Sequence, residues 1–457
     1  MNIYMHVEIS ARELDSKLLL ATLAASRGHQ VIISDISGIV SGITKGLLAP
    51  GIFHTKSLTP TKKKIARHQA IVNKGFLITS IDEEAGLDID GYEEFSKTRY
   101  SEKTMEQSSM VFAWGSDDEE TLKQDYSKHS SKIIKTGSPR ADLWKPLFSD
   151  YWGIPFLTPK KPFLLISSNM GWSNGMVPFH ESFINFKRAG YYQREPELVD
   201  FHFGYTADNY LTTAAFIKAI QHLSEHNNGY DIVLRPHPAE NIEIWKIFLD
   251  GIPNVHVIRE DSISAWVNNA FAVMHNGCTT AFETIVSNKP LLTYVPYVQK
   301  YGNELPNKLG FHIQTPEELL KKVNTIFDDL KSDVKKNINK PIPELISKKI
   351  FFDGEELAAY KIVKKWDSLT SENLSQTSNW TKFQWFLKAT NFKRTLSKVL
   401  KKLFPNRLGN YKENYKFPPL NKNDISKRIS SLEQVLGIDE KLECKLLSER
   451  TILIKQP

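Results

Sequence analysis

Two short stretches of the chain indicate its fold: "VLRPHPAENIEIW" at residues 233–245 and "VMHNGCTTAFETI" at residues 273–285. Each begins with an apolar run typical of a buried strand, continues with a short polar segment and ends in a pattern typical of a helix. In an open α/β sheet, ligands bind outside the carboxyl ends of the strands, where such polar segments lie. The two stretches therefore predict a parallel sheet with a binding site at its edge.

The same alternation of strand and helix extends over most of the chain. It starts with a strand in "IYMHVEI", a helix over residues 13–27 and a strand in "QVIISD", and further strands are expected at 76–82, 110–115 and 132–137. The Pro- and Trp-rich residues 144–162 interrupt it, and a second series follows with strands in "FLLISS", "YDIVLRP", "VHVIRE", "FAVMHNG" and "PLLTYVP". Repeated βα units with apolar strands predict parallel sheets that are covered on both faces.

We therefore expect an α/β protein with two Rossmann-like parallel-sheet domains that face each other across a cleft, followed by a helical C-terminal extension. The first domain is expected at residues 1–145 and the second at 146–365. Residues 366–457 are expected to form a polar linker and a basic helical tail.

Composition restricts the class of protein. The chain has 457 residues, of which 41% are hydrophobic and 24% charged, and a formal net charge of +7. These values fit a globular protein of two or three domains, and the mild basic excess fits an anionic ligand or a membrane surface without requiring nucleic acid. The two cysteines, Cys278 and Cys444, lack metal-ligand spacing and favour a reducing compartment. No secretory signal pattern and no run of about 18 apolar residues is found, so a cytoplasmic location is expected.

The first polar segment contains Arg235 and His237, each followed by a proline. Pro236 and Pro238 keep the preceding residues extended, so both side chains are expected to be held in fixed directions. Arg235 offers a planar fork for phosphate oxygens, and His237 offers a hydrogen-bond donor. The alternative is structural: an ion pair of Arg235 and capping of the next helix by His237.

The second polar segment is expected to place a helix start beside the same ligand. His275 ends the strand, Asn276 and Gly277 form the turn, and Thr279 and Thr280 open the helix. Free backbone N–H groups at a helix start suit a phosphate, although simple capping by the threonines explains the same residues. Glu283, one turn into the helix, is expected either to hold ribose hydroxyls or to face solvent.

Two further loops follow strands and are candidates for contact with the ligand. The loop "SSNMGWSNG" at residues 167–175 has the composition to bind a diphosphate through its backbone N–H groups, which makes Ser168 and Asn169 candidates. In "KTGSPRADLW", Arg140 follows a strand and either contacts phosphate or forms an ion pair in a turn.

These motifs resemble those of a known enzyme class. "RPHP" together with "HNGCTTAFETIVSNKPLLTYVP" resembles the nucleotide-binding half of GT-B glycosyltransferases of bacterial surface-polysaccharide assembly, most of all the capsule and lipopolysaccharide transferases of the Kdo and sialic-acid type. "HVEISARELDSKLLLA", "GIFHTKS", "SIDEEAGL" and "KTGSPRADLW" are similar to a surface-carbohydrate biosynthesis family, so the resemblance covers roughly residues 1–365. Where the CMP-type pattern has two serines, this chain has Thr279 and Thr280.

The resemblance implies a nucleotide-sugar donor and a glycan acceptor. A lipid-linked acceptor is expected if residues 381–404 lie on a membrane. The favoured donor is a CMP-linked ulosonic acid such as Kdo, and no other cofactor is expected. Three alternatives remain: a CDP-alditol phosphotransferase, an isomerase of the UDP-sugar epimerase kind, and a binding protein without activity.

Three acids follow the strand "FLITSI" and are the candidates for catalysis: Asp82, Glu83 and Glu84. Glycosyl transfer needs a carboxylate as base or nucleophile, and we expect Asp82 to serve because it is nearest to the strand. The alternative is a solvated helix start that is enriched in acids. Glu8, Arg12 and Lys56 are weaker candidates for the same site.

A metal ion is not expected, although "DID" at residues 88–90 imitates the Asp-x-Asp of metal-dependent transferases. Residues 381–404 carry seven Lys or Arg and no acid, with apolar residues at roughly helical spacing. This segment is expected either to lie on an anionic membrane or to pack its apolar stripe on the domains. Nucleic acid is not an expected partner, because no RNA- or DNA-binding motif accompanies the charge.

Overall fold

The computed structural model describes most of the chain and divides it into two compact units. Unit 1 comprises residues 1–85, 91–143 and 343–457, and unit 2 comprises residues 86–90 and 144–342. The residues that the structure describes are 1–84, 87, 92–301, 304–332, 343–354, 356–369, 378–403 and 416–457. No helix within these ranges is both long enough and apolar enough to cross a membrane.

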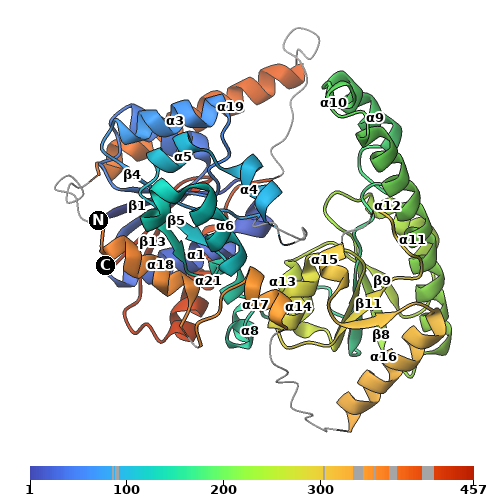
Figure 1. Ribbon diagram of the computed structural model, residues 1–457. Helices are drawn as coiled ribbons and strands as arrows, with labels where there is room; N and C mark the ends of the chain where they lie inside the picture. Colours follow the sequence, from blue (N-terminus) through green and yellow to red (C-terminus); the bar gives the residue numbers. More distant parts are fainter. Residues whose placement is uncertain are drawn as a thin grey trace. The chain divides into compact units, whose positions relative to one another are not determined.

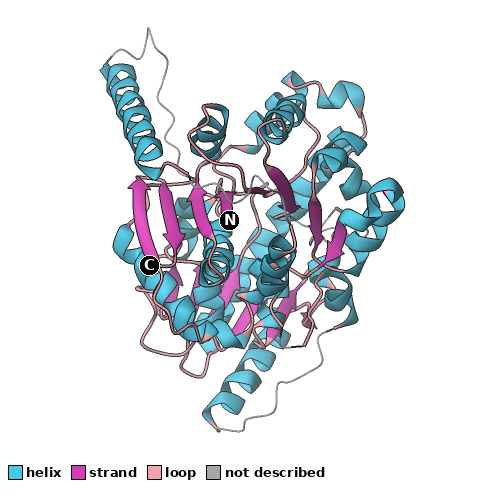
Figure 2. Cartoon of the chain, turned by 90° about the vertical axis from the view of Figure 1, so that its left-hand side faces the viewer, coloured by secondary structure: helices cyan, strands magenta, loops and turns pink. Residues whose placement is uncertain are grey.

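Unit 1 is built on an eight-stranded sheet with the order β13-β14-β2-β1-β3-β4-β5-β6. Six strands are parallel, whereas β14 is antiparallel to β2 and to β13 (Figure 2). Their bounds are β1 Asn2–His6, β2 Gln30–Ser34, β3 Ile52–Thr55, β4 Leu77–Ile81, β5 Met110–Ala113, β6 Ile133–Lys135, β13 Glu443–Ser448 and β14 Thr451–Lys455.

Helices cover both faces of this sheet (Figure 1). α1 contacts α7, α18 and α21 on one face, whereas α2 contacts α3, which in turn contacts α5, on the other. The bounds are α1 Ser10–Ser26, α2 Ile36–Thr44, α3 Lys62–Val72, α4 Glu93–Arg99, α5 Glu102–Gln107, α6 Ser116–Asp125, α7 Pro139–Asp142, α17 Glu344–Lys349, α18 Ala358–Asp367, α19 Trp380–Leu403 and α21 Lys422–Leu436.

Unit 2 has a six-stranded, wholly parallel sheet with the order β12-β11-β10-β7-β8-β9. Its strands are β7 Phe163–Ser167, β8 Asp231–Arg235, β9 Val255–Val257, β10 Ala272–His275, β11 Leu291–Tyr294 and β12 Phe311–Ile313. Its helices are α8 Ser149–Trp152, α9 Phe179–Arg188, α10 Tyr191–Arg194, α11 Leu198–His226, α12 Ile242–Leu249, α13 Ile263–Asn269, α14 Thr280–Val286, α15 Glu304–Asn307 and α16 Pro316–Lys331. The continuous apolar runs in β7 and β8 are buried because helices pack on both faces.

The expected α/β class with two parallel-sheet, Rossmann-like domains and a helical C-terminal region is confirmed. The C-terminal residues, however, are placed differently from the expected tail. β14 pairs with β2 and its Ile452 and Ile454 are fully buried, while Thr451 and Ser34 share a 2.7 Å hydrogen bond between their hydroxyl groups. Residues 343–369 and 416–457 therefore complete unit 1, because β14 and α21 cover apolar surface that the first 143 residues leave exposed.

The order of the strands reverses once in each unit. In unit 1 the chain runs from β1 to β2 on one side and then crosses to β3 on the other side of β1. In unit 2 it runs from β7 through β8 to β9 and then crosses to β10 on the other side of β7. Such reversals open a crevice at the carboxyl ends of the two diverging strands, which is where α/β proteins bind ligands. We call these places the β1/β3 edge and the β7/β10 edge.

Candidate functional site

At the β7/β10 edge, hydrogen bonds join the three loops that follow β7, β8 and β10. The Ser168 hydroxyl donates to both carboxylate oxygens of Glu240, at 2.8 and 3.0 Å. The Asn169 side-chain amide donates to the Gly277 carbonyl oxygen at 2.9 Å. The stretches at residues 233–245 and 273–285 are therefore both tied to the loop that follows β7.

Glu240 is the hub of these loops, and sequence reasoning missed it. Its carboxylate is fully buried and also accepts from the Met170 N–H at 2.8 Å, the His237 N–H at 3.3 Å and the Trp245 indole N–H at 2.6 Å. Burial raises the pKa of this carboxyl, against the effect of its donors. The only signal in the sequence is an acid at the end of "RPHPAE", which is equally typical of a solvated helix start.

Arg235 has a structural role instead of the expected contact with phosphate. Its guanidinium donates to the carbonyl oxygens of Arg259 and Glu260, both at 2.7 Å, and to that of Asp261. Burial lowers its pKa to about 10. The fork that was expected to hold a ligand instead fixes the loop after β9, where Asp261 has a φ of 65°.

His237 is exposed and has the geometry of a donor. Its Nδ1 accepts from the Ala239 N–H at 3.2 Å, so the neutral imidazole carries its proton on Nε2. Desolvation by the surrounding protein, and then the Arg259 guanidinium, lower its pKa. The turn between Pro236 and Pro238 thus presents an N–H group at the edge of the sheet.

His275 is enclosed within unit 2, which differs from its expected role as a ligand contact. The ring is fully buried, with Nε2 2.9 Å from the Thr293 hydroxyl and Nδ1 accepting from the Cys278 N–H at 3.4 Å. Burial lowers its pKa to about 3, so it stays neutral. His275 therefore fixes the turn after β10 rather than contacting a ligand.

The rest of the second stretch is mostly engaged in the same turn. The Asn276 side-chain amide donates to the Tyr294 carbonyl oxygen at 2.8 Å, and the Gly277 N–H donates to the Asn307 side chain at 2.7 Å. Thr280 and Glu283 are buried. Thr279, at the N-cap of α14, is half-buried and its hydroxyl does not cap the helix.

In unit 1, the three acids after β4 are ion-paired. Arg99 holds Asp82 through two hydrogen bonds of 2.8 and 2.9 Å, and the Asp82 side chain is only 2% exposed. Glu83 accepts from the buried Lys17 ammonium at 2.6 Å. Glu84 is 45% exposed and pairs with Arg99 at 2.9 Å and with Arg12 at 3.7 Å. Asp82, which was favoured for catalysis because it is nearest to the strand, is thus the least exposed of the three acids, and Glu84 is the most exposed.

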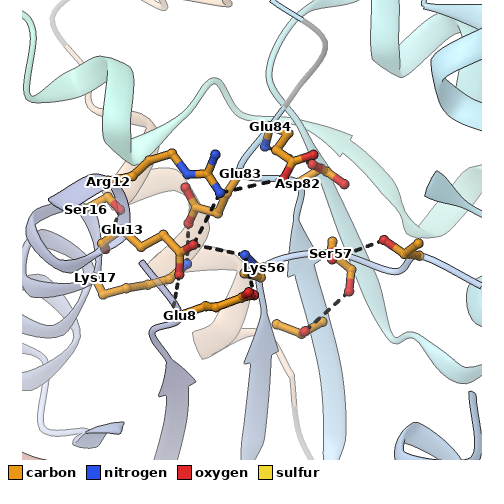
Figure 3. A network of polar contacts seen from close by, with 12 residues as sticks. Glu8, Arg12, Glu13, Ser16, Lys17, Lys56, Ser57, Asp82, Glu83 and Glu84 are labelled. Carbon is orange, nitrogen blue, oxygen red and sulfur yellow. Dashed lines mark hydrogen bonds and ion pairs between the residues drawn. The ribbon is translucent and has the colours of Figure 1, made fainter. Parts of the chain in front are cut away.

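Beside these acids, Lys56 lies between two carboxylates at the end of β3. Its ammonium is 2.8 Å from Glu8 and 3.0 Å from Glu13 (Figure 3). Burial alone would lower the pKa of Lys56, but Glu13 and Glu8 outweigh it and raise the pKa. Lys56 is thus a compensated cation, and Glu8 has a lowered pKa because Lys56 donates to it.

A cavity of about 290 Å³ opens at the β1/β3 edge. Its walls come from the ends of β1, β2 and β3, from α3 and from residues 416–417, and it is lined by His6, Val7, Glu8, Asp35, Ile36, Lys56, Lys64, Arg67, Lys416 and Phe417. Four of the lining side chains are cationic and two are carboxylates. Sequence reasoning named Glu8 and Lys56 here and missed the remaining cations.

The other candidates lie elsewhere. Arg140 is on α7 in unit 1, where its N–H donates to the Ser138 hydroxyl at 3.1 Å. Asp88 and Asp90 fall outside the described residues. Within the described ranges, no group of three or more His, Cys, Asp or Glu side chains has an arrangement that suits a metal ion.

Comparison with solved structures identifies the same two-domain fold in known enzymes. UDP-GlcNAc 2-epimerase from Methanocaldococcus jannaschii matches with a TM-score of 0.50 and 11% identity, over 80% of this chain and 99% of that one. UDP-GlcNAc 2-epimerase from Neisseria meningitidis bound to UDP-GlcNAc gives 0.44 and 15%, over 81% and 100%. The wall teichoic acid polymerase TagF gives 0.38 and 11%, over 69% and 72%. No protein-family model and no curated protein matches the chain.

Proposed function

We propose that the chain is a nucleotide-sugar-dependent glycosyltransferase that extends a cell-surface glycan. The observation that carries this proposal is the β7/β10 edge, where Glu240 binds the loop after β7 and Asn169 links that loop to the loop after β10. That frame does not engage the Nε2–H of His237, and the hydroxyl of Thr279 does not cap α14, so we assign both groups to the ligand. Both are neutral donors, which suit the phosphate of a nucleotide sugar.

The proposed reaction needs one proton acceptor and one stabilised leaving group. The acceptor hydroxyl oxygen forms a bond to the anomeric carbon, while the bond from that carbon to the phosphate oxygen breaks and the nucleotide leaves with the electron pair. The hydroxyl proton passes to a carboxylate. Donors around the phosphate stabilise the charge that develops on it.

Among the three acids after β4, Glu84 is the best proton acceptor in this proposal. Asp82 is buried and has both carboxylate oxygens bound by Arg99, and Glu83 is buried against Lys17. The carboxylate of Glu84 is accessible and is held by Arg99 and Arg12. We therefore assign Asp82 and Glu83 to the support of the site.

The motifs favour a CMP-linked ulosonic acid such as Kdo as donor. The main alternative is an isomerase, since fold neighbours carry the name UDP-GlcNAc 2-epimerase. The third is a CDP-alditol phosphotransferase. Incubation with each nucleotide sugar separates them: an isomerase changes the donor without any acceptor, a phosphotransferase adds phosphorus to the product, and a glycosyltransferase does neither.

The assignment of His237 is tested by calorimetry on the full chain. His237→Ala should abolish binding of the donor nucleotide while the unfolding transition stays unchanged, because the side chain is exposed. His256→Ala is the control, since this histidine lies in the same unit on the edge strand β9. Equal donor affinity in the wild-type chain and in His237→Ala would refute the assignment.

We also propose that α19 rests on an anionic membrane, in keeping with a lipid-linked acceptor. Phe383 and Leu387 pack into the core of unit 1, whereas Trp385 and Phe392 are 71% and 70% exposed among Lys382, Lys388 and Lys393. Exposed aromatic rings next to lysines suit a bilayer surface with acidic lipids. Co-sedimentation with phosphatidylglycerol vesicles should fall for Trp385→Ala/Phe392→Ala, and equal sedimentation would refute the contact.

A further inference from the structure

The cavity at the β1/β3 edge is placed where the topology of unit 1 predicts a ligand. It is lined by His6, which ends β1, by Val7 and Glu8, which follow β1, and by Lys56, which follows β3. These are the two strands at which the order of the sheet reverses. The cavity therefore lies at the position where α/β proteins bind ligands.

The charges around this cavity do not balance. Lys56 is compensated by Glu8 and Glu13. Lys64 and Arg67, in contrast, form no ion pair with any residue in the described ranges, and the buried Nε of Arg67 has no hydrogen-bond partner there. The carboxylate of Asp35 caps α2, accepting from the Gly38 N–H at 2.7 Å.

The positive potential in the cavity is visible in the pKa values of its lining groups. Burial, and then repulsion from Arg67 and Arg99, lower the pKa of Lys64 to about 8. Burial and the surrounding cations, Lys17 and Arg67 foremost, hold the pKa of His6 well below its usual value. Partly buried cations without a counter-ion are costly, so a bound anion would stabilise this arrangement.

The geometry of the cations suits an oxyanion. Lys64 and Arg67 are three residues apart on α3 and therefore lie on the same face of the helix. The Lys64 ammonium is oriented by the Ser57 hydroxyl, to which it donates at 2.7 Å. A lysine point charge next to an arginine fork is a common combination for phosphate and carboxylate groups.

We propose that this cavity binds a phosphate or carboxylate group of the acceptor substrate through Lys64 and Arg67. The assignment of this anion to the acceptor rests on the proposed function, whereas the oxyanion site itself does not. At about 290 Å³ the cavity is at the small end of ligand pockets, so it fits one charged sugar unit.

The test is calorimetric titration of the full chain with inorganic phosphate, glycerol 3-phosphate and glucuronate. The variant Lys64→Met/Arg67→Met should bind the preferred anion at least tenfold more weakly than the wild-type chain. The matched control is Lys62→Met/Lys63→Met, which removes the same charge from exposed positions on the same helix and should leave the affinity unchanged. A preference for the two phosphates or for glucuronate identifies the source of the oxyanion, and either supports the site.

Equal affinity in the two double variants, or no binding of any of the three anions by the wild-type chain, would overturn the proposal. The single variant Lys64→Gln is a second test, because it keeps a polar group near Ser57 and removes only one charge. Titration with CMP distinguishes this proposal from the proposed function. Lys64→Met/Arg67→Met should bind CMP as the wild-type chain does, so a failure of the anion site leaves the nucleotide assignment standing.

Discussion

The β1/β3 edge and the β7/β10 edge share a topology and differ in chemistry. Each lies where the order of the strands reverses in a parallel sheet. At the β7/β10 edge, the Glu240 carboxylate accepts from donors of the protein itself, and the Arg235 guanidinium donates to backbone carbonyl oxygens. At the β1/β3 edge, Lys64 and Arg67 remain without a carboxylate partner in the described chain. Topology therefore decides where a ligand binds, and the side chains decide which chemistry it meets.

The difference extends below the surface of each edge. In unit 2 the support is one buried carboxylate that accepts from neutral donors in the loop after β7, in the loop after β8 and on α12. In unit 1 the support is a set of buried ion pairs, of which Lys17–Glu83 is the most enclosed (Figure 3). A frame of neutral donors suits a site that must stay rigid, whereas a frame of ion pairs sets an electrostatic potential for the groups above it.

The largest expected effect comes from breaking the buried ion pair of unit 1. Lys17→Met removes the partner of Glu83 at 2.6 Å and leaves a carboxylate that is only 5% exposed. Removing one member of a buried pair typically costs about 3–5 kcal/mol. Urea-induced unfolding followed by tryptophan fluorescence should therefore show a lower midpoint for unit 1.

Two matched variants sharpen this result. Lys103→Met breaks the exposed pair with Glu106 and should leave the unfolding midpoint close to that of the wild-type chain, because solvent screens an exposed ion pair. Lys17→Met/Glu83→Leu removes both charges and should recover much of the loss. If Lys17→Met unfolds at the same urea concentration as Lys103→Met, the ion-pair frame does not support this edge.

The hub of unit 2 should give a somewhat smaller effect. Glu240→Ala leaves the Met170 N–H, the Ser168 hydroxyl and the Trp245 indole N–H without their buried acceptor. Each loss is costly, but removal of a carboxyl whose pKa is raised by burial offsets part of it, so we expect about 3 kcal/mol. The measurement is the urea-induced unfolding transition, followed by tryptophan fluorescence as for Lys17→Met.

Glu243→Ala is the control for the hub, because Glu243 follows three residues later and is exposed. Its unfolding midpoint should match that of the wild-type chain. Full stability of Glu240→Ala would show that the loops after β7 and β8 are held together by other contacts, and the contrast between the two edges would then disappear.

The fold and the convergence of the loops were predictable because they depend on local patterns. Alternating apolar runs and helical segments define the βα units, and parallel strands bring their carboxyl ends to one edge. The hydrogen bond from the Asn169 side chain to the Gly277 carbonyl oxygen shows that the loops after β7 and β10 lie side by side at this edge. The role of His237 as a donor to the ligand stays a prediction, and the structure adds that its Nδ1 accepts from the Ala239 N–H, two residues away.

The roles of single side chains were not predictable, because their partners are distant in sequence. Arg235 donates to the backbone carbonyl oxygens of residues 259–261. Asp82 accepts hydrogen bonds from Arg99, which lies 17 residues later. The segment "KKKIARH" at residues 62–68 reads as a solvated basic helix start, since its composition does not tell which two cations face the cavity. β14 was missed because an apolar run near the end of a chain is equally typical of a helix in a tail.

The smallest effect is also the most specific to the β1/β3 edge: a pH dependence of sulfate affinity. Sulfate stays dianionic near neutrality, so the titration of the ligand does not intervene. Lys64, whose pKa is about 8, is charged below that pH and loses its proton above it, while a bound anion raises the pKa. The affinity should therefore be flat below pH 7 and fall above pH 8 by up to tenfold per unit, or about 1.4 kcal/mol.

The groups that face Lys64 do not produce this profile. Arg67 and Arg99 keep their charge, the pKa of Lys56 is raised, and burial and the nearby cations hold the pKa of His6 well below this range. Lys64→Arg therefore gives the decisive comparison, because a guanidinium keeps its charge over the whole range and should bind sulfate with a flat profile. The same decline in Lys64→Arg as in the wild-type chain would place the titrating group elsewhere and remove Lys64 from the site.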